Sequence, residues 1–196
     1  MTDSGAAPTR PTTDIDVVAE ISTPMQYYDF SEQLRVLGFT EDNQPESPTC
    51  RWLHGQLILD VMPTEAGALG FTNRWYRDVV KTADKTFLPT GRAIQLINPP
   101  CFLGTKIEAF RTRGNGDCFS SHDLEDFVAV IDGRQSILEE IRSTEMNLRD
   151  ELADAVRELL AQNRFIDALP GYMLPDDSSQ LRLPRLLATL KAISAC

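Results

Sequence analysis

The sequence predicts a mixed α/β protein, in which a β-sheet core is flanked by helices and followed by a helical C-terminal part. Short alternating or β-branched runs, typical of strands, are interspersed with amphipathic stretches up to about residue 135. Beyond that point the apolar residues recur only at helical spacing. The composition, 42% hydrophobic and 24% charged, is that of an ordinary soluble globular domain.

The length of 196 residues suits one domain with a helical appendage. We expect a flexible segment at 1–9, a core over 10–135, and a helical region over 136–196 packed on that core. No apolar run approaches the ~20 residues of a membrane span, and no signal-peptide pattern follows the first residue. The four cysteines are scattered without a C-x-x-C pair, which favours the cytoplasm. The net charge of −10 argues against a broad nucleic-acid-binding surface.

The first predicted strand, residues 14–18, places two acids on one face. Side chains alternate along a strand, so Asp14 and Asp16 share a face, roughly 6–7 Å apart. Ile15 and Val17 are then expected to point into the core. Two adjacent carboxylates repel each other and raise one another's pKa unless a cation lies between them. Oxygen ligands on a rigid strand suit Mg²⁺, although a solvent-facing strand end would show the same pattern.

A third acid lies in the most strand-like run of the chain. Residues 51–54 and 56–62 are predicted to form a hairpin that turns at Gly55. Asp60 lies within its aliphatic second strand, where an unpaired charge would be costly. A metal shared with Asp14 and Asp16 would supply the missing partner. Three carboxylates on two strands are the minimum set for divalent-metal phosphoryl or nucleotidyl transfer.

Between and after these strands the pattern predicts further elements. Thr23 and Pro24 are expected to cap and begin a helix that ends at Gly38. Its core-facing residues are Tyr27, Phe30, Leu34 and Leu37. The remaining predicted elements are loops at 40–50 and 63–71, a helix at 73–80, strands at 86–88 and 92–97, and helices at 137–142, 148–160 and 183–193. Trp75 is interpreted as a core anchor rather than a substrate contact.

One predicted helix, beginning at Pro99-Pro100, carries a lysine on a mainly apolar stretch. On spacing alone, Lys106 is a snorkelling side chain with its head in water. A loop at 111–117 follows, and then a helix capped by Ser120 or Ser121. Asp123 and Asp126, three residues apart, share one face of that helix, where acids also complement the helix dipole.

Three motifs in register resemble a known family. The run R-P-T-T-D-I-D-V-V at 10–18 resembles the catalytic strand of the DNA polymerase β-like nucleotidyltransferases. More narrowly, it is similar to the minimal nucleotidyltransferases of abortive-infection (AbiE-type) toxin–antitoxin systems. That family has a D-x-D strand, a third acid on a neighbouring strand, and a lysine on a helix followed by paired acids. The matching segments here, 105–110 and 120–126, occur in the same order, so the resemblance covers about residues 10–135.

The resemblance implies a nucleotidyltransferase-like core that moves a nucleotidyl group from an NTP to an RNA, such as a tRNA-like molecule, or to a protein. Asp14, Asp16 and Asp60 would hold Mg²⁺ or Mn²⁺, and Asp60 would help deprotonate the attacking hydroxyl. The nucleotide contacts would come from Thr13 and Lys106. An acid of the later segment, Asp123 or Asp126, would orient the lysine. The resemblance also implies an antitoxin as a possible partner.

The chain departs from the family before the D-x-D strand. The family has a Gly-Gly or Gly-Ser turn there, which opens a helix and holds nucleotide phosphates, and only nine residues precede Arg10 here. The alternatives are therefore an N-terminally truncated enzyme and a catalytically silent, nucleotidyltransferase-shaped interaction protein. The intact acid set opposes the silent alternative, because an idle cluster of acids destabilises a fold.

Overall fold

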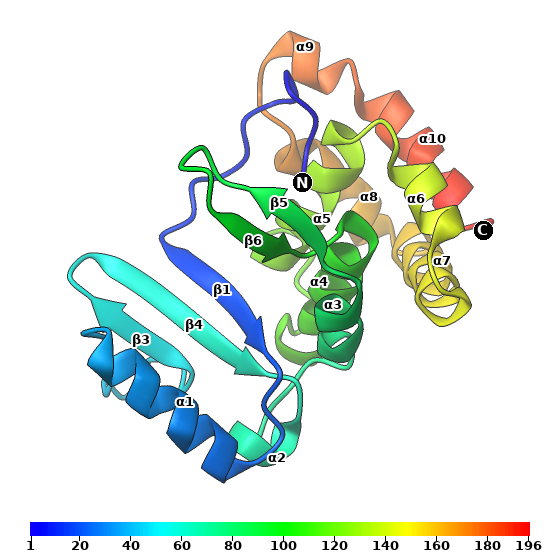
Figure 1. The fold of residues 1–196 in the computed structure, drawn as a ribbon. Helices are drawn as coiled ribbons and strands as arrows, with labels where there is room; N and C mark the ends of the chain where they lie inside the picture. Colours follow the sequence, from blue (N-terminus) through cyan, green and yellow to red (C-terminus); the bar gives the residue numbers. More distant parts are fainter. The chain divides into compact units, whose positions relative to one another are not determined.

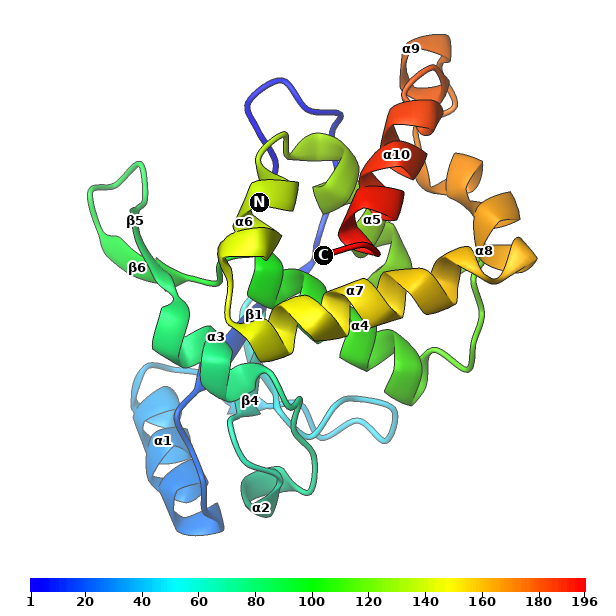
Figure 2. The ribbon, with the colours of Figure 1, turned by 90° about the vertical axis from the view of Figure 1, so that its right-hand side faces the viewer.

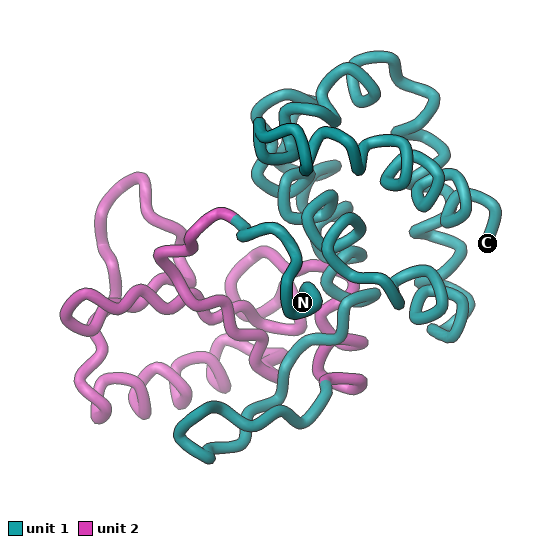
Figure 3. The backbone as a smooth tube through the Cα atoms, turned by 90° about the horizontal axis from the view of Figure 1, so that it is seen from above, with its two compact units in different colours: residues 1–9, 84–196 teal, residues 10–83 magenta.

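A computed structural model describes residues 1–196 and divides them into two compact units (Figure 3). Residues 10–83 form one, here called the sheet unit; residues 1–9 and 84–196 form the other, the helical unit. Together they contain a mixed four-stranded sheet, a two-stranded sheet and a helical C-terminal half. The predicted α/β class is therefore confirmed. The predicted domain limits at residues 9 and 135 stay predictions.

The sheet unit is built on a mixed sheet with the strand order β1-β4-β3-β2 (Figure 1). β1 pairs in parallel with β4, and β4-β3 and β3-β2 are antiparallel. The element bounds are β1 Asp14–Ala19, α1 Pro24–Val36, β2 Thr40–Glu41, β3 Arg51–His54, β4 Leu57–Pro63, α2 Ala66–Leu69 and α3 Tyr76–Thr82. β1 is consequently an edge strand of this sheet, with β4 as its one neighbour.

Helix α1 begins and ends as predicted. The Thr23 hydroxyl accepts a hydrogen bond from the Gln26 backbone N–H, and the Gln26 side-chain oxygen accepts one from the Thr23 backbone N–H, which completes a capping box. Gly38 follows the helix with φ of 87°, a left-handed conformation that glycine adopts without strain. The prediction for Leu37 is wrong. Leu37 is 67% exposed, because it occupies the C-cap and the helix has already ended at Val36.

The core of the sheet unit lies between α1 and the sheet. Its buried residues are Ile21, Tyr27, Leu34, Trp52 and Val61. Trp52 donates an indole hydrogen bond to the Tyr27 hydroxyl, 3.3 Å away, so the one polar group of each ring is satisfied. The strand residues of this cluster come from β3 and β4, the inner strands of the sheet.

The expected burial of Ile15 and Val17 is wrong. Register places them beside Leu59 and Val61, on the sheet face that carries the core. They are nevertheless 55% and 36% exposed. The reason is their position on the edge strand: the core cluster covers β3 and β4 and reaches β1 only at its C-terminal end, at Ala19.

The helical unit consists of a hairpin followed by helices (Figure 2). Its elements are β5 Asp84–Phe87, β6 Ala93–Leu96, α4 Pro99–Arg113, α5 His122–Gly133, α6 Ile137–Ser143, α7 Met146–Leu160, α8 Asn163–Ala168, the 3₁₀ helix η1 Leu169–Tyr172, α9 Asp177–Gln180 and α10 Leu183–Ile193. α4 contacts α5, α6 and α7, and α10 contacts the same three. Leu103, Phe127, Leu152 and Leu190 are fully buried where these helices meet.

Several short elements were not predicted. β2 and α2 lie in segments expected to be loops, and α4 runs on to Arg113, past the expected helix end. The helices between α7 and α10 are also additional. Elements of two to six residues carry too few periodic positions to separate them from loops. No helix of the structure combines the length and the apolar character that crossing a membrane requires.

Candidate active site

The three strand acids lie on one face of the sheet unit. Parallel pairing sets Asp16 directly beside Asp60, and Asp14 two residues earlier beside Ile58. Neighbouring residues in register point to the same face, so both strands direct their acids to the side of the sheet away from α1. Thr13 directly precedes β1 and is exposed. The structure therefore brings Asp14, Asp16 and Asp60 onto one face, as the alternation along β1 predicts.

The cation among these acids is Arg51. It lies on β3 opposite Asp60, and its Nε and Nη2 donate hydrogen bonds to the two Asp60 carboxylate oxygens at 2.8 and 2.7 Å. The same Nη2 donates to Asp14 Oδ2 at 3.2 Å. Hydrogen bonding to Asp60 is the main cause that raises the pKa of Arg51, and the charges of Asp60 and Asp14 add to it. Arg51 thus supplies to Asp60 the positive charge that was expected to come from a metal ion.

The donor chemistry of this face fits Mg²⁺, but Arg51 takes up part of it. Carboxylate oxygens are the ligands that Mg²⁺ prefers, and one or two suffice when substrate phosphates supply the rest. With Arg51 in this position, however, no group of three or more His, Cys, Asp or Glu side chains is arranged to hold a metal ion. Asp14 and Asp16 could serve as metal ligands, whereas both oxygens of Asp60 are committed to Arg51.

A buried thiol lies close to the same acids. Cys50, directly before β3, is 5% exposed. Burial raises its pKa to about 11, and the charges of Asp60 and Asp16 contribute in the same direction. The thiol therefore stays protonated near neutral pH, the opposite of a metal-binding or nucleophilic cysteine. His54, four residues on, donates a ring hydrogen bond to the Gly38 carbonyl, and no zinc site forms.

The second predicted cluster lies between α4 and α5 of the helical unit. Lys106 Nζ on α4 is 2.5 Å from Asp126 Oδ2 and 3.8 Å from Asp123 Oδ1 on α5. Arg113, at the end of α4, donates to both oxygens of Asp123, at 3.0 and 3.2 Å. Lys106 is 19% exposed and paired, so the snorkelling interpretation does not hold. Asp126 is its closer partner, whereas Asp123 is shared with Arg113.

The helix that carries these acids begins at Ser121, whose hydroxyl accepts a hydrogen bond from the Leu124 backbone at 3.3 Å. Of the two serines proposed as N-cap, Ser121 is therefore the correct one. A carboxylate oxygen of Glu125 lies 3.2 Å from the His122 ring. His122 itself is 71% exposed, as expected for a residue at a helix start.

The chain matches no model of a known protein family and no curated protein. The assignment of function therefore depends on the two charged clusters themselves. One is Arg51 with the strand acids in the sheet unit, and the other is Lys106 with Asp123 and Asp126 in the helical unit.

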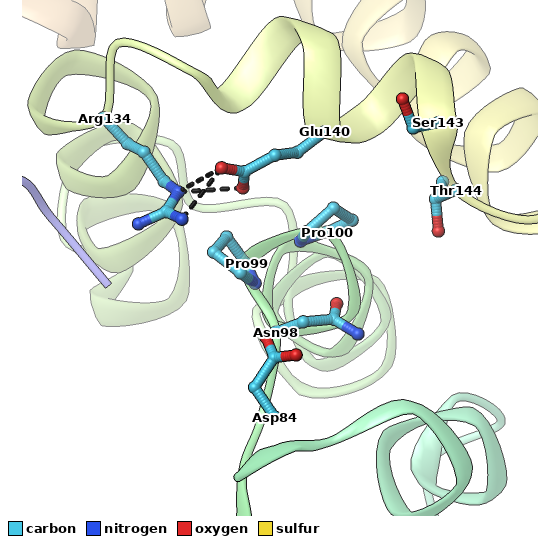
Figure 4. Close-up of a pocket in the computed structure, with 8 residues that line it drawn as sticks. All are labelled: Asp84, Asn98, Pro99, Pro100, Arg134, Glu140, Ser143 and Thr144. Carbon is cyan, nitrogen blue, oxygen red and sulfur yellow. Dashed lines mark hydrogen bonds and ion pairs between the residues drawn. The ribbon is translucent and has the colours of Figure 1, made fainter. Parts of the chain in front are cut away.

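Neither Arg134 nor the start of α4, which line a cavity in the helical unit, offers a site for phosphate. A cavity of about 370 Å³ in the helical unit is lined by the start of α4 and by Arg134 and Glu140 (Figure 4). Arg134 Nε lies 2.8 and 2.9 Å from the two Glu140 oxygens, so its charge is already matched. The helix start offers little, because Pro99 and Pro100 lack backbone N–H groups and Asn98 caps the next one.

Trp75 is buried, with the Arg74 guanidinium 4.9 Å from its ring. This burial agrees with its interpretation as a core anchor. The structure provides no hydrogen-bond acceptor for its buried indole N–H.

Proposed function

We propose that the chain is a Mg²⁺-dependent nucleotidyltransferase that moves a nucleotidyl group from an NTP to an RNA or protein acceptor. One observation carries the proposal: Asp14, Asp16 and Asp60 lie on one sheet face, on two parallel strands that are in register. The resemblance to the polymerase β-like nucleotidyltransferases supports the same conclusion from the sequence. Its narrower similarity to abortive-infection toxins suggests a toxin whose activity an antitoxin would restrain.

Each residue has a role that follows from its chemistry. Bound Mg²⁺ would offset the triphosphate charge and activate the acceptor hydroxyl. Asp14 and Asp16 would hold the ion, and Asp60 would accept the proton of the attacking hydroxyl. The acceptor oxygen then bonds to the α-phosphorus, the bond from that phosphorus to the bridging oxygen breaks, and pyrophosphate leaves. The resemblance assigns the triphosphate to Lys106, and Asp126 orients the Nζ of that lysine.

Calorimetric titration tests this proposal. Each NTP, with Mg²⁺, is titrated into the wild type and into Asp14→Ala/Asp16→Ala. The matched control is Asp29→Ala/Glu32→Ala, which removes two carboxylates from the exposed side of α1. We expect binding by the wild type and the control, and none by the first variant. Absence of binding by the wild type overturns the proposal for this chain.

One observation favours a second candidate, a catalytically silent interaction protein. The sequence argued against a silent protein because a cluster of unused acids destabilises a fold. Arg51 removes that objection, because it already neutralises Asp60 and contacts Asp14. An antitoxin-like protein would then be the partner. The same titration separates the candidates, since a silent protein binds no NTP in the presence of Mg²⁺.

A further inference from the structure

Arg51 contacts acids on two different strands at once. From β3 its guanidinium crosses to Asp60 on the adjacent β4, and its Nη2 also reaches Asp14 on β1, the strand beyond. Asp60 is held by both of its oxygens and Asp14 by one. A single side chain thus connects three strands across the face that the proposed reaction needs.

This contact and metal binding compete at Asp60. Mg²⁺ requires ligand oxygens at about 2.0–2.1 Å in near-octahedral geometry. Each Asp60 oxygen directs one of its two lone pairs at a guanidinium N–H 2.7–2.8 Å away, which leaves fewer lone pairs for a metal. The positive charge of Arg51 would also repel a divalent cation placed beside it. Asp60 therefore becomes a better metal ligand and proton acceptor once Arg51 has moved away from it.

The exposure of the group allows such a movement. The Arg51 side chain is 22% exposed and that of Asp14 34%, so solvent reaches the guanidinium. Its planar fork matches phosphate oxygens as well as it matches a carboxylate. When Mg²⁺ and a triphosphate bind together, Mg²⁺ can replace Arg51 beside the acids, and the triphosphate can pair with the displaced guanidinium.

We infer that Arg51 closes the acidic face in the free protein and, on binding of metal and nucleotide, exchanges Asp60 and Asp14 for the triphosphate. This inference rests on the proposed nucleotidyltransferase function. It makes Arg51 a nucleotide-binding residue that also limits metal binding in the absence of nucleotide. Replacing Arg51 should therefore have two opposite effects: tighter binding of metal alone and weaker binding of NTP.

The experiment first measures the affinity for Mn²⁺ in the absence of nucleotide, from the paramagnetic signal of the free ion. It then measures the affinity for NTP at saturating Mg²⁺ by calorimetry. Arg51→Gln is expected to bind Mn²⁺ about tenfold more tightly than the wild type and NTP about tenfold more weakly, each the size of one charge-assisted contact. Arg51→Lys keeps the positive charge without the planar guanidinium, so its affinities should lie between those of the wild type and Arg51→Gln. It replaces the glutamine variant in the experiment if that variant does not fold. Arg35→Gln is the control, because that arginine pairs with Glu32 and Glu41 elsewhere in the sheet unit.

The outcomes separate the inference from the proposed function. Suppose that the wild type binds NTP and that the Arg51 variants bind Mn²⁺ as the wild type does, or bind both Mn²⁺ and NTP more weakly, as expected if Arg51 is only structural. The inference is then wrong and the proposed function stands. Mn²⁺ binding by Arg51→Gln without NTP binding by any form overturns the function and the exchange, and retains the closure by Arg51. If no form binds either Mn²⁺ or NTP, the inference and the proposed function are both overturned.

Discussion

Replacing either partner of the Arg51–Asp60 pair should destabilise the sheet unit more than replacing Asp14. The two Arg51–Asp60 hydrogen bonds are short, and the Asp60 side chain is only 10% exposed. Arg51→Met leaves that carboxylate without its partner. Breaking a fully buried ion pair costs about 3–5 kcal/mol of stability. Because the Arg51 side chain is 22% exposed, we expect this substitution to cost less, about 2–3 kcal/mol.

A double-mutant cycle isolates the pairwise contribution. For Arg51→Met with Asp60→Asn we expect a coupling energy of about 2 kcal/mol, from two charge-assisted hydrogen bonds. For Arg51→Met with Asp14→Asn we expect about 0.5 kcal/mol. That contact is a single bond of 3.2 Å to a side chain that is 34% exposed, and it behaves as a surface pair.

Urea unfolding followed by tryptophan fluorescence suits this cycle. The protein has two tryptophans, Trp52 and Trp75, and both are buried in the sheet unit, so the signal reports on that unit. The control cycle uses Arg35 with Glu41, an exposed pair expected to couple by less than about 0.5 kcal/mol. A coupling below that value between Arg51 and Asp60, or a stronger coupling to Asp14 than to Asp60, would refute the reasoning.

Three further predictions follow from burial. Ile15→Ser should lower the free energy of unfolding by less than about 1 kcal/mol, whereas Val61→Ala, at a fully buried position, should cost about 2 kcal/mol; equal losses in urea would mean that Ile15 is packed. Cys50, with its pKa raised to about 11 by burial, should resist iodoacetamide at pH 8 until the protein unfolds, while the more exposed Cys196 reacts; mass spectrometry of the peptides decides this. Burial raises the pKa of Tyr172 from 10.0 to about 12, so its contribution to stability is complete below pH 10 and is lost as the pH rises through 12; an absorbance titration in which Tyr172→Phe removes no late-ionising tyrosine would contradict this.

Local signals predicted the features that depend on neighbouring residues. The capping box of Thr23 and Gln26 and the left-handed Gly38 both follow from short motifs. The alternation of residues 14–18 likewise placed Asp14 and Asp16 on one face. These features need only a few consecutive positions, and so they could be predicted from the sequence.

The burial of a strand face depends instead on where the strand lies in the sheet. Alternation correctly put Ile15 and Val17 on the face opposite the acids, but it does not reveal that β1 is an edge strand. Helix α1 covers the inner strands, and the aliphatic side chains at the edge stay exposed. Alternation by itself does not distinguish an edge strand from a central one, since strand order is set by pairings distant in sequence.

The role of Arg51 is an intermediate case, because the sequence contained a usable signal. A buried acid in a strand requires a cation, but that requirement does not distinguish a metal from a guanidinium. The hairpin register does. A two-residue turn at Gly55 and Gln56 pairs His54 with Leu57 and, three positions further out, Arg51 with Asp60. Directly opposed residues on neighbouring strands have Cβ atoms roughly 5 Å apart, within easy reach of an arginine fork. The cation demanded by Asp60 could therefore have been found in the chain itself before a metal was invoked, and any metal at this face has to compete with it.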